Sequence, residues 1–256
     1  MLGINLDNNQ FLASKTGRRG LISFGLILIL PIILIILFGF FRINGELPEY
    51  SEQYMRSFAQ LGSITLTNKI RALVDLGDIF AQKPQFRELV AGGQWENAIS
   101  VANSLTGTKL NDFINRILLL APDGTLMAGS PSFEGENLIG TSFASRDYYK
   151  GVSREWKPYV SEIFQRASYP QYNVTTIAIP IFEPTGDDSA EHVAGILGLS
   201  VVVDQFLARM GKIEIGNGVT MYVVDQRGRI AMHPTQPAMA DFSSVPVVQS
   251  VLKGEF

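Results

Sequence analysis

The sequence has no cysteine and only two histidines, His192 and His233. A chain without thiols cannot form disulfide bridges, use a cysteine nucleophile or build a Cys/His zinc site. Charged residues make up only 18% of the 256 residues, and the 21 basic side chains are scattered. A nucleic-acid-binding surface needs basic residues gathered into a stripe that neutralises phosphates. We therefore expect no metal, no cofactor and no nucleic-acid partner.

The sequence also has little that could form a catalytic centre. His192 lies where a strand is expected to begin and His233 precedes a proline, and neither has a partner at metal-ligand spacing. The stretch 215–218 contains two glycines but lacks the lysine of a phosphate-binding loop. An enzyme would need a nucleophile–base pair or a metal cluster. An extracytoplasmic enzyme is therefore the least supported interpretation of these residues.

One long apolar run is present. Leu21–Phe41 contains 21 residues and no charge, and at about 1.5 Å per residue a helix of this length spans roughly the 30 Å core of a bilayer. A secretory signal peptide would have an apolar core of about 7–15 residues, followed by a small-residue cleavage site. Residues 42–46 contain no such site. The run predicts an uncleaved transmembrane signal anchor.

The residues before the anchor predict its orientation. Lys15, Arg18 and Arg19 precede it, against the single acid Asp7. Because basic flanks stay inside, residues 1–20 are expected to be a cytoplasmic tail. Everything after the anchor, with 18 basic and 23 acidic residues, is then periplasmic or extracellular, held at the inner (plasma) membrane.

Helical periodicity follows the anchor. Apolar residues recur at three- and four-residue steps from Pro48, which predicts a helix over roughly 48–82 that ends at Lys83-Pro84. This is long for a globular helix, so we expect it to continue from the membrane span as a stalk. Its apolar stripe exceeds what one lobe can cover, which favours a homodimer through the stalk. A second helix is predicted over 95–105, and residues 42–105 form the stalk and flanking helices.

From Phe113 the pattern changes to that of strands. Pro122-Asp123-Gly124 is typical of a hairpin turn. A loop that passes into a short helix is predicted over 140–150, and a connecting helix over 205–210. The predicted strands are 116–120, 125–128, 159–164, 175–182 and 193–202.

The strand–turn–strand pattern then returns over 220–232. Gly124 corresponds to Gly228 and Leu126 to Ile230, an offset of 104, and Tyr148–Gly151 is echoed by Val251–Gly254 at an offset of 103. Two landmarks at nearly one spacing predict a duplicated α+β unit of about a hundred residues. Chance similarity between two glycine turns is the alternative. The second unit reaches Phe256 before the strands that end the first, so its sheet is expected to be incomplete in this chain.

An anchor, a stalk helix and two tandem α+β lobes together resemble the double-Cache extracytoplasmic sensors of bacterial transmembrane receptors. The stretches that carry the resemblance are Ser145–Gly151, Pro158–Ser161, Ile177–Ile181, Val193–Gly198 and Tyr222–Asp225.

The resemblance implies an α+β fold with an N-terminal transmembrane helix, a long stalk helix and two PAS-like lobes with antiparallel sheets. Residues 106–211 would be the membrane-distal, ligand-binding lobe, and 212–256 the start of a truncated membrane-proximal lobe. The family attaches this module to histidine kinases, chemoreceptors, diguanylate cyclases and phosphatases. A kinase or cyclase module elsewhere in the full-length protein is therefore compatible with the sequence.

A small-molecule site is predicted in the distal lobe. Arg146 offers a planar fork of donors for a carboxylate. Tyr148 and Tyr149 offer apolar walls that end in a hydroxyl group. Tyr159 and Ser161 share one face of their predicted strand and could line the same cavity. The alternative is a surface arginine beside core tyrosines.

One branch of the family binds α-amino acids, and the chain matches its pattern in part. Arg146 and Tyr149 stand where the branch has its arginine and tyrosine, and Tyr148 replaces a tryptophan. The acid that would neutralise the ammonium group is absent from 169–176, where Tyr172 and Asn173 offer only hydrogen bonds. Asp147 could instead neutralise Arg146. The expected ligand is thus a carboxylate or an amino acid. A partner-binding or structural surface domain without a small ligand is the alternative function.

Overall fold

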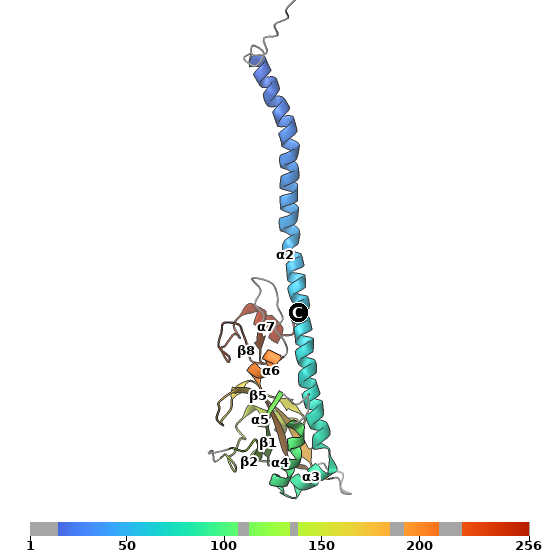
Figure 1. Ribbon diagram of the computed structural model, residues 1–256, viewed down its shortest axis with the longest axis vertical. Coiled ribbons are helices and arrows are strands. Elements are labelled where there is room, and N and C mark those ends of the chain that lie inside the picture. Colours follow the sequence, from blue (N-terminus) through green and yellow to red (C-terminus); the bar gives the residue numbers. More distant parts are fainter. Residues whose placement is uncertain (1–14, 107–112, 134–137, 185–191, 210–221, 256) are drawn as a thin grey trace, which may run out of the picture. The chain divides into compact units, whose positions relative to one another are not determined.

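A computed structural model describes residues 15–106, 113–133, 138–184, 192–209 and 222–255 (Figure 1). In the first helix, side chains are described for 32–38 and from residue 53 onward. The chain divides into two compact units, Met1–Gly62 and Ser63–Phe256. The predicted boundary at 211–212 and the stretch 215–218 lie outside the described residues.

The first unit contains most of helix α2 (Lys15–Ala81), which has 67 residues in all. The predicted amphipathic helix over 48–82 is part of it and ends at Ala81. It ends there because Pro84 holds the preceding Lys83 in an extended conformation, with ψ of 126°. No helix long and apolar enough to cross a membrane is found among the described residues. Most side chains of the predicted anchor, Leu21–Phe41, lie outside the described set.

The second unit begins with the last part of α2 and two short helices, α3 (Pro84–Ala91) and α4 (Trp95–Ala102). A 3-10 turn, η1 (Asn103–Thr106), follows α4, so the predicted helix over 95–105 is matched by α4 and η1 together. Gly93, with φ of 68°, makes the turn between α3 and α4.

A six-stranded antiparallel sheet forms the centre of the second unit. Its spatial order is β2-β1-β6-β5-β3, and β4 also pairs with β5. The strands are β1 (Ile114–Leu120), β2 (Leu126–Ser130), β3 (Tyr159–Val160), β4 (Phe164–Gln165), β5 (Asn173–Phe182) and β6 (Val193–Val202).

Helices cover both faces of this sheet (Figure 1). Because successive strand residues point to opposite faces, Leu119 packs in the core with α2, α3 and α4, while Leu120 packs with helix α5 (Asp147–Glu155). α2 lies close to the sheet at Gly77, where an added Cβ would come within 2.1 Å of the buried Ile179 Cδ1.

The strand predicted over 159–164 is wrong as a single element. It is interrupted after β3, and pairing with β5 resumes at β4. In between, the backbone N–H of Glu162 donates to the carboxylate of Asp147, and that of Ile163 donates to Asp225. These side-chain acceptors replace strand partners, so the segment leaves the sheet between its two short strands.

After β6 the chain forms α6 (Val203–Arg209), β7 (Val223–Val224), β8 (Ile230–Met232) and α7 (Pro246–Leu252). The hairpin β7–β8 repeats the hairpin β1–β2. Gly124 N–H donates to Ala121 O, and Gly228 N–H donates to Asp225 O, again at an offset of 104. Both glycines have positive φ, 86° and 79°.

The second landmark of the repeat is wrong. Phe143 N–H donates to Gly124 O, and Phe242 N–H donates to Gly228 O, so the spacing after the hairpin is 99 residues rather than 103. Lys150 lies inside α5, whereas Lys253 follows the end of α7. The shared Lys-Gly pair is therefore a coincidence of sequence, and Arg146 corresponds to Val245.

Candidate functional site

A small cavity lies between α5 and the sheet. Its volume is about 40 Å³, which is space for a few water molecules at most. The polar residues that line it are Arg116, Arg146, Tyr148, Arg166, Ser168, Thr176 and Ser200. The apolar residues are Leu118, Leu126, Phe133, Leu138, Phe143, Phe164, Ala167 and Val174.

Three of the polar side chains form a row across adjacent strands. Arg116 on β1 pairs with Ser200 on β6, which pairs in turn with Thr176 on β5. All three residues are buried, with exposed fractions of 8%, 4% and 1%. Thr176 Oγ1 has no hydrogen-bond partner among the described residues. A buried polar atom in that state costs about 1–3 kcal/mol, which a ligand that bonds to it would recover.

Arg146 is the N-cap residue of α5, and its side chain lines the cavity. Its guanidinium lies 5.4 Å from the ring centroid of Phe164 and 6.0 Å from that of Phe143. Among the described residues, no carboxylate forms an ion pair with it. Asp147 forms no ion pair with it, and its carboxylate accepts hydrogen bonds from the Tyr159 hydroxyl and from Glu162 N–H. The aromatic contacts hold a cation in place without consuming its donors.

Tyr148 forms one wall of the same cavity. It is 2% exposed, and its ring lies 5.6 Å from that of Phe164. Burial raises the pKa of the Tyr148 hydroxyl, and the nearby Arg146 opposes the rise only in part. The group therefore stays neutral and can donate a hydrogen bond throughout the physiological pH range.

Arg166 supplies a further cation, just after β4. Its Nε donates to Pro170 O at 2.6 Å, and its Nη1 donates to Asn115 Oδ1 at 2.5 Å. The guanidinium also lies 4.7 Å from the ring centroid of Tyr172. These contacts position the charge of a residue that is only 8% exposed.

Of the seven predicted site residues, Arg146 and Tyr148 line this cavity, and Tyr172 contacts its lining residue Arg166. Tyr149 does not line it. Its hydroxyl donates to Pro122 O at 2.9 Å. Asn173 begins β5 and pairs with Gln165.

The structure does not bring Tyr159 and Ser161 together in one cavity. The Tyr159 hydroxyl donates to the carboxylate of Asp147 at 3.2 Å. Ser161 Oγ donates to Glu162 O at 2.7 Å and accepts from Thr176 N–H at 2.9 Å. Because the predicted strand is interrupted between β3 and β4, its side-chain alternation does not persist.

Five polar residues of the lining were not predicted: Arg116, Arg166, Ser168, Thr176 and Ser200. Arg116 and Thr176 each lie inside an apolar strand, and Arg116 shares a face with Leu118 and Leu120 through strand alternation. A polar residue at such a position was the signal available in the sequence. Arg166 follows a strand whose end could not be located from the pattern.

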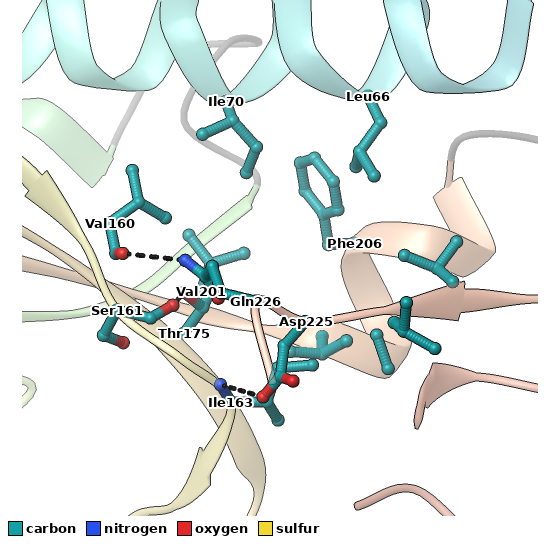
Figure 2. Close-up of a pocket in the computed structure, with 14 residues that line it drawn as sticks. Leu66, Ile70, Val160, Ser161, Ile163, Thr175, Val201, Phe206, Asp225 and Gln226 are labelled. Carbon is teal, nitrogen blue, oxygen red and sulfur yellow. Dashed lines mark hydrogen bonds between the residues drawn. The ribbon is translucent and has the colours of Figure 1, made fainter. Parts of the chain in front are cut away.

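A larger cavity of about 240 Å³ lies elsewhere in the second unit (Figure 2). Leu66 and Ile70 of α2, Phe206 of α6 and the hairpin β7–β8 enclose it. Its wall is almost entirely apolar. The polar side chains there are engaged, since Gln226 Nε2 donates to Val160 O at 3.1 Å and Asp225 accepts from Ile163 N–H. The smaller cavity is the one whose lining includes Thr176, a buried hydroxyl without a partner among the described residues, and it is therefore the better candidate for a ligand bound through hydrogen bonds.

The fold is similar to that of solved chemoreceptor ligand-binding domains, which agrees with the Cache-type fold that the sequence resemblance predicted. The ligand-binding domain of the Pseudomonas aeruginosa PAO1 amino-acid chemoreceptor PctB, in complex with L-Gln, matches with a TM-score of 0.55. Its sequence identity is 16%, over 75% of this chain and 72% of that one.

Two further solved domains give similar values. The ligand-binding domain of the Pseudomonas fluorescens chemoreceptor CtaA with L-alanine has a TM-score of 0.54 and 15% identity, over 75% of this chain and 76% of that one. The ligand-binding domain of Mlp24 with asparagine has a TM-score of 0.53 and 18% identity, over 76% and 75%. No protein-family model and no curated protein matches the sequence.

Proposed function

We propose that this chain is the extracytoplasmic sensing region of a membrane-bound signal-transduction receptor. It binds a carboxylate or an amino-acid-like metabolite in the small cavity beside Arg146. One observation carries the proposal: a buried polar row crosses an otherwise apolar sheet face, and Arg146 stands over the same cavity without a carboxylate partner among the described residues. Buried polar groups of this kind are costly in a domain that only packs.

Each lining group has a role in this proposal. Arg146 forms charge-assisted hydrogen bonds to the ligand carboxylate. Thr176 and the Tyr148 hydroxyl bind its remaining polar atoms, and the rings of Phe143 and Phe164 enclose its apolar part. The fold neighbours were solved with L-Gln, L-alanine and asparagine, which supports an amino acid. The described lining contains no acid for an ammonium group, which supports a plain carboxylate.

The cavity of about 40 Å³ must enlarge to admit such a ligand. Binding then selects a state in which α5 or the segment after β4 lies farther from the sheet. A ligand shifts such an equilibrium by its difference in affinity for the two states. We infer that the shift alters how the sheet packs on α2, and that α2 carries the displacement through the membrane.

Membrane attachment and dimerisation belong to the same proposal. Leu21–Phe41 would be the anchor, with residues 1–20 in the cytoplasm, as the apolar run and its basic flank indicate. Tyr54 and Leu61 are about 60% exposed. They stand seven residues apart and so share one face of α2, which supports a homodimer through this helix.

The decisive experiment is a thermal-shift titration of the full chain in detergent. The probes are L-glutamine, L-alanine, L-asparagine, acetate and succinate. A probe at a hundred times its Kd should stabilise the fold by about 2.7 kcal/mol. Arg146→Ala should weaken binding by about a hundredfold, because a buried charge-assisted contact is lost. Arg154→Ala is the matched control, since Arg154 is an exposed arginine on the same helix.

Equal responses from Arg146→Ala and the unaltered chain would show that the ligand binds elsewhere. Stabilisation by none of the probes would favour the second candidate, a partner-binding or structural surface domain without a small ligand. The small volume of the cavity is the observation that supports this second candidate.

A further inference from the structure

The helix that carries Arg146 and Tyr148 also touches a charged network that ends on the second-lobe hairpin. Asp147 stands between these two cavity residues, and its carboxylate faces the segment 159–162. It accepts from the Tyr159 hydroxyl at 3.2 Å and from Glu162 N–H at 2.9 Å. The start of α5 is therefore bonded directly to the segment between β3 and β4.

The same segment is bonded to the cavity strand. Ser161 Oγ accepts from Thr176 N–H at 2.9 Å, and Thr175 Oγ1 donates to Ser161 O at 2.8 Å. Thr176 is one of the residues that line the cavity. The segment thus has fixed contacts to two sides of the proposed ligand site.

The side chain of Glu162 continues the network to the hairpin β7–β8. Its carboxylate lies 2.6 Å from Arg227 Nε and 2.9 Å from Arg229 Nη2. The Glu162 side chain is only 12% exposed and that of Arg229 21%. Arg229 also pairs with Asp225 at 2.7 Å. The Arg227 side chain is 65% exposed, so the partly buried Glu162–Arg229 pair is the one that is sensitive to the removal of one partner.

Two further contacts connect the hairpin to the segment. Asp225 accepts from Ile163 N–H at 3.3 Å, and Gln226 donates to Val160 O at 3.1 Å (Figure 2). Asp225 Oδ1 also accepts from the N–H groups of Arg227 and Arg229, each at 2.9 Å. The hairpin backbone is thus ordered by the residue that contacts the segment.

We propose that Glu162 couples the ligand-site helix α5 to the second-lobe hairpin, so that displacement of α5 reaches β7–β8 through Asp147, Glu162, Arg227 and Arg229. The coupling rests on the proposed function for its biological role, but the contacts operate without a ligand. Burial and the neighbouring Asp147 raise the pKa of Glu162, against the opposing effect of Arg227 and Arg229. Keeping the Glu162 carboxylate ionised therefore costs free energy. This is typical of an ion pair that fixes one arrangement of the chain and adds little to stability.

Amide hydrogen exchange of the full chain in detergent, without ligand, tests the coupling. Glu162→Gln should speed exchange at the amides of Arg227 and Arg229 about tenfold, because a charge-assisted contact is lost. Asp147→Ala should speed the same amides by at least about threefold, as expected for residues of one network. The double variant should exchange no faster than Glu162→Gln alone. Asp123→Ala, in the turn of the first hairpin, is the matched control and should change nothing at Arg227 and Arg229.

Unchanged hairpin exchange in Asp147→Ala, or fully additive effects in the double variant, would overturn the proposal. If Asp147→Ala also speeds exchange in β1 and β6, the variant has lost its fold, and Tyr159→Phe decides. That change removes only the hydroxyl that donates to Asp147, and it should still speed the hairpin amides; no effect would refute the coupling. Because no ligand is used, these results stand apart from those of the thermal-shift titration.

Discussion

The hairpin and helix of the first copy, described over 121–133 and 138–155, have the same arrangement as those over 225–254, and their backbone hydrogen bonds correspond from Ala121 and Asp225 as far as Lys150 and Gln249. Leu126 N–H donates to Thr141 O in the first copy, and Ile230 N–H donates to Ala240 O in the second. Lys150 N–H donates to Arg146 O, and Gln249 N–H donates to Val245 O. The two copies thus share a backbone arrangement that does not depend on their particular side chains.

The side chains that carry charge are distributed in opposite ways. Arg146 and Tyr148 of the first copy are matched by Val245 and Val247, so the second copy lacks the groups that line the cavity. In the hairpin, the positions of Asp225, Arg227 and Arg229 are held in the first copy by Ala121, Asp123 and Thr125. The comparison indicates one repeated scaffold in which the helix of one copy carries residues that line the small cavity and the hairpin of the other carries residues that form ion pairs with Glu162.

The largest difference is expected at the matched pair Tyr148 and Val247. Tyr148 is 2% exposed and Val247 57% exposed, because β5 and β6 lie against α5. Tyr148→Ala should lower the free energy of unfolding by about 3 kcal/mol through the loss of a buried ring. Val247→Ala should change it by no more than about 0.5 kcal/mol. Urea unfolding followed by circular dichroism measures both, and equal losses would contradict the burial difference.

The shared turn glycines should give a smaller effect that is alike in the two copies. A Cβ at Gly124 would lie 2.9 Å from the Tyr149 ring, and one at Gly228 2.8 Å from Ser243 Cα. With positive φ as well, alanine at either position should cost about 2 kcal/mol. Urea unfolding measures the change in the first copy, and hydrogen exchange of the hairpin amides measures it in the second.

Gly140 provides the control for this prediction. Its φ of 83° is similar, but a Cβ there would meet nothing within 4 Å. Gly140→Ala should therefore cost only the backbone strain, about 1 kcal/mol. A loss as large as that at Gly124 would show that crowding does not matter in these turns.

The smallest effect concerns pH and has opposite signs at the two hairpins. Burial raises the pKa of Glu162, which contacts the second hairpin, above its ordinary value of 4.5. The folded chain then binds more protons than the unfolded chain in the range just above pH 4.5, so the free energy of unfolding falls as the pH rises through that range. Glu162→Gln should remove this slope.

At the first hairpin, hydrogen bonds from Thr125 lower the pKa of Asp123 below 3.8. Its stabilising contribution is present above pH 3.8 and is lost as the pH falls below that value. Asp123→Asn should remove that loss and leave the slope above pH 4.5 unchanged. Urea titrations at a series of pH values measure both slopes, and a slope of the same sign at both sites would contradict the assignment.

Local chemistry explains which elements the sequence predicted. Glycine turns with positive φ and regular apolar spacing depend on neighbouring residues only, so both hairpins and the end of α2 just before Lys83-Pro84 could be located. The interruption between β3 and β4 could not. It depends on Asp147 and Asp225, which lie 15 and 62 residues from the backbone groups that they accept from. Such acceptors leave no mark in the strand's own pattern.

The cavity was predicted in part for the same reason. Arg146 and Tyr148 belong to a short stretch that resembles a known sensor pattern and could be located from it. Thr176 and Ser200 become cavity residues only through the pairing of β5 with β6. That register is a long-range property of the sheet. Tyr149, which shares the same stretch, was assigned to the ligand, but its hydroxyl bonds to Pro122 O.

Because α2 approaches the sheet closely at Gly77, a substitution at this position can change the distance between α2 and the sheet without any ligand. A Cβ there would come within 2.1 Å of Ile179 Cδ1 and 2.9 Å of Leu199 Cδ1, on the sheet face away from the cavity. Alanine would displace the ends of those two buried side chains, and a larger residue would lift the helix itself. Substituting residues of increasing size at position 77 would therefore increase the distance between α2 and the sheet in steps. The residues that line the cavity would stay unchanged.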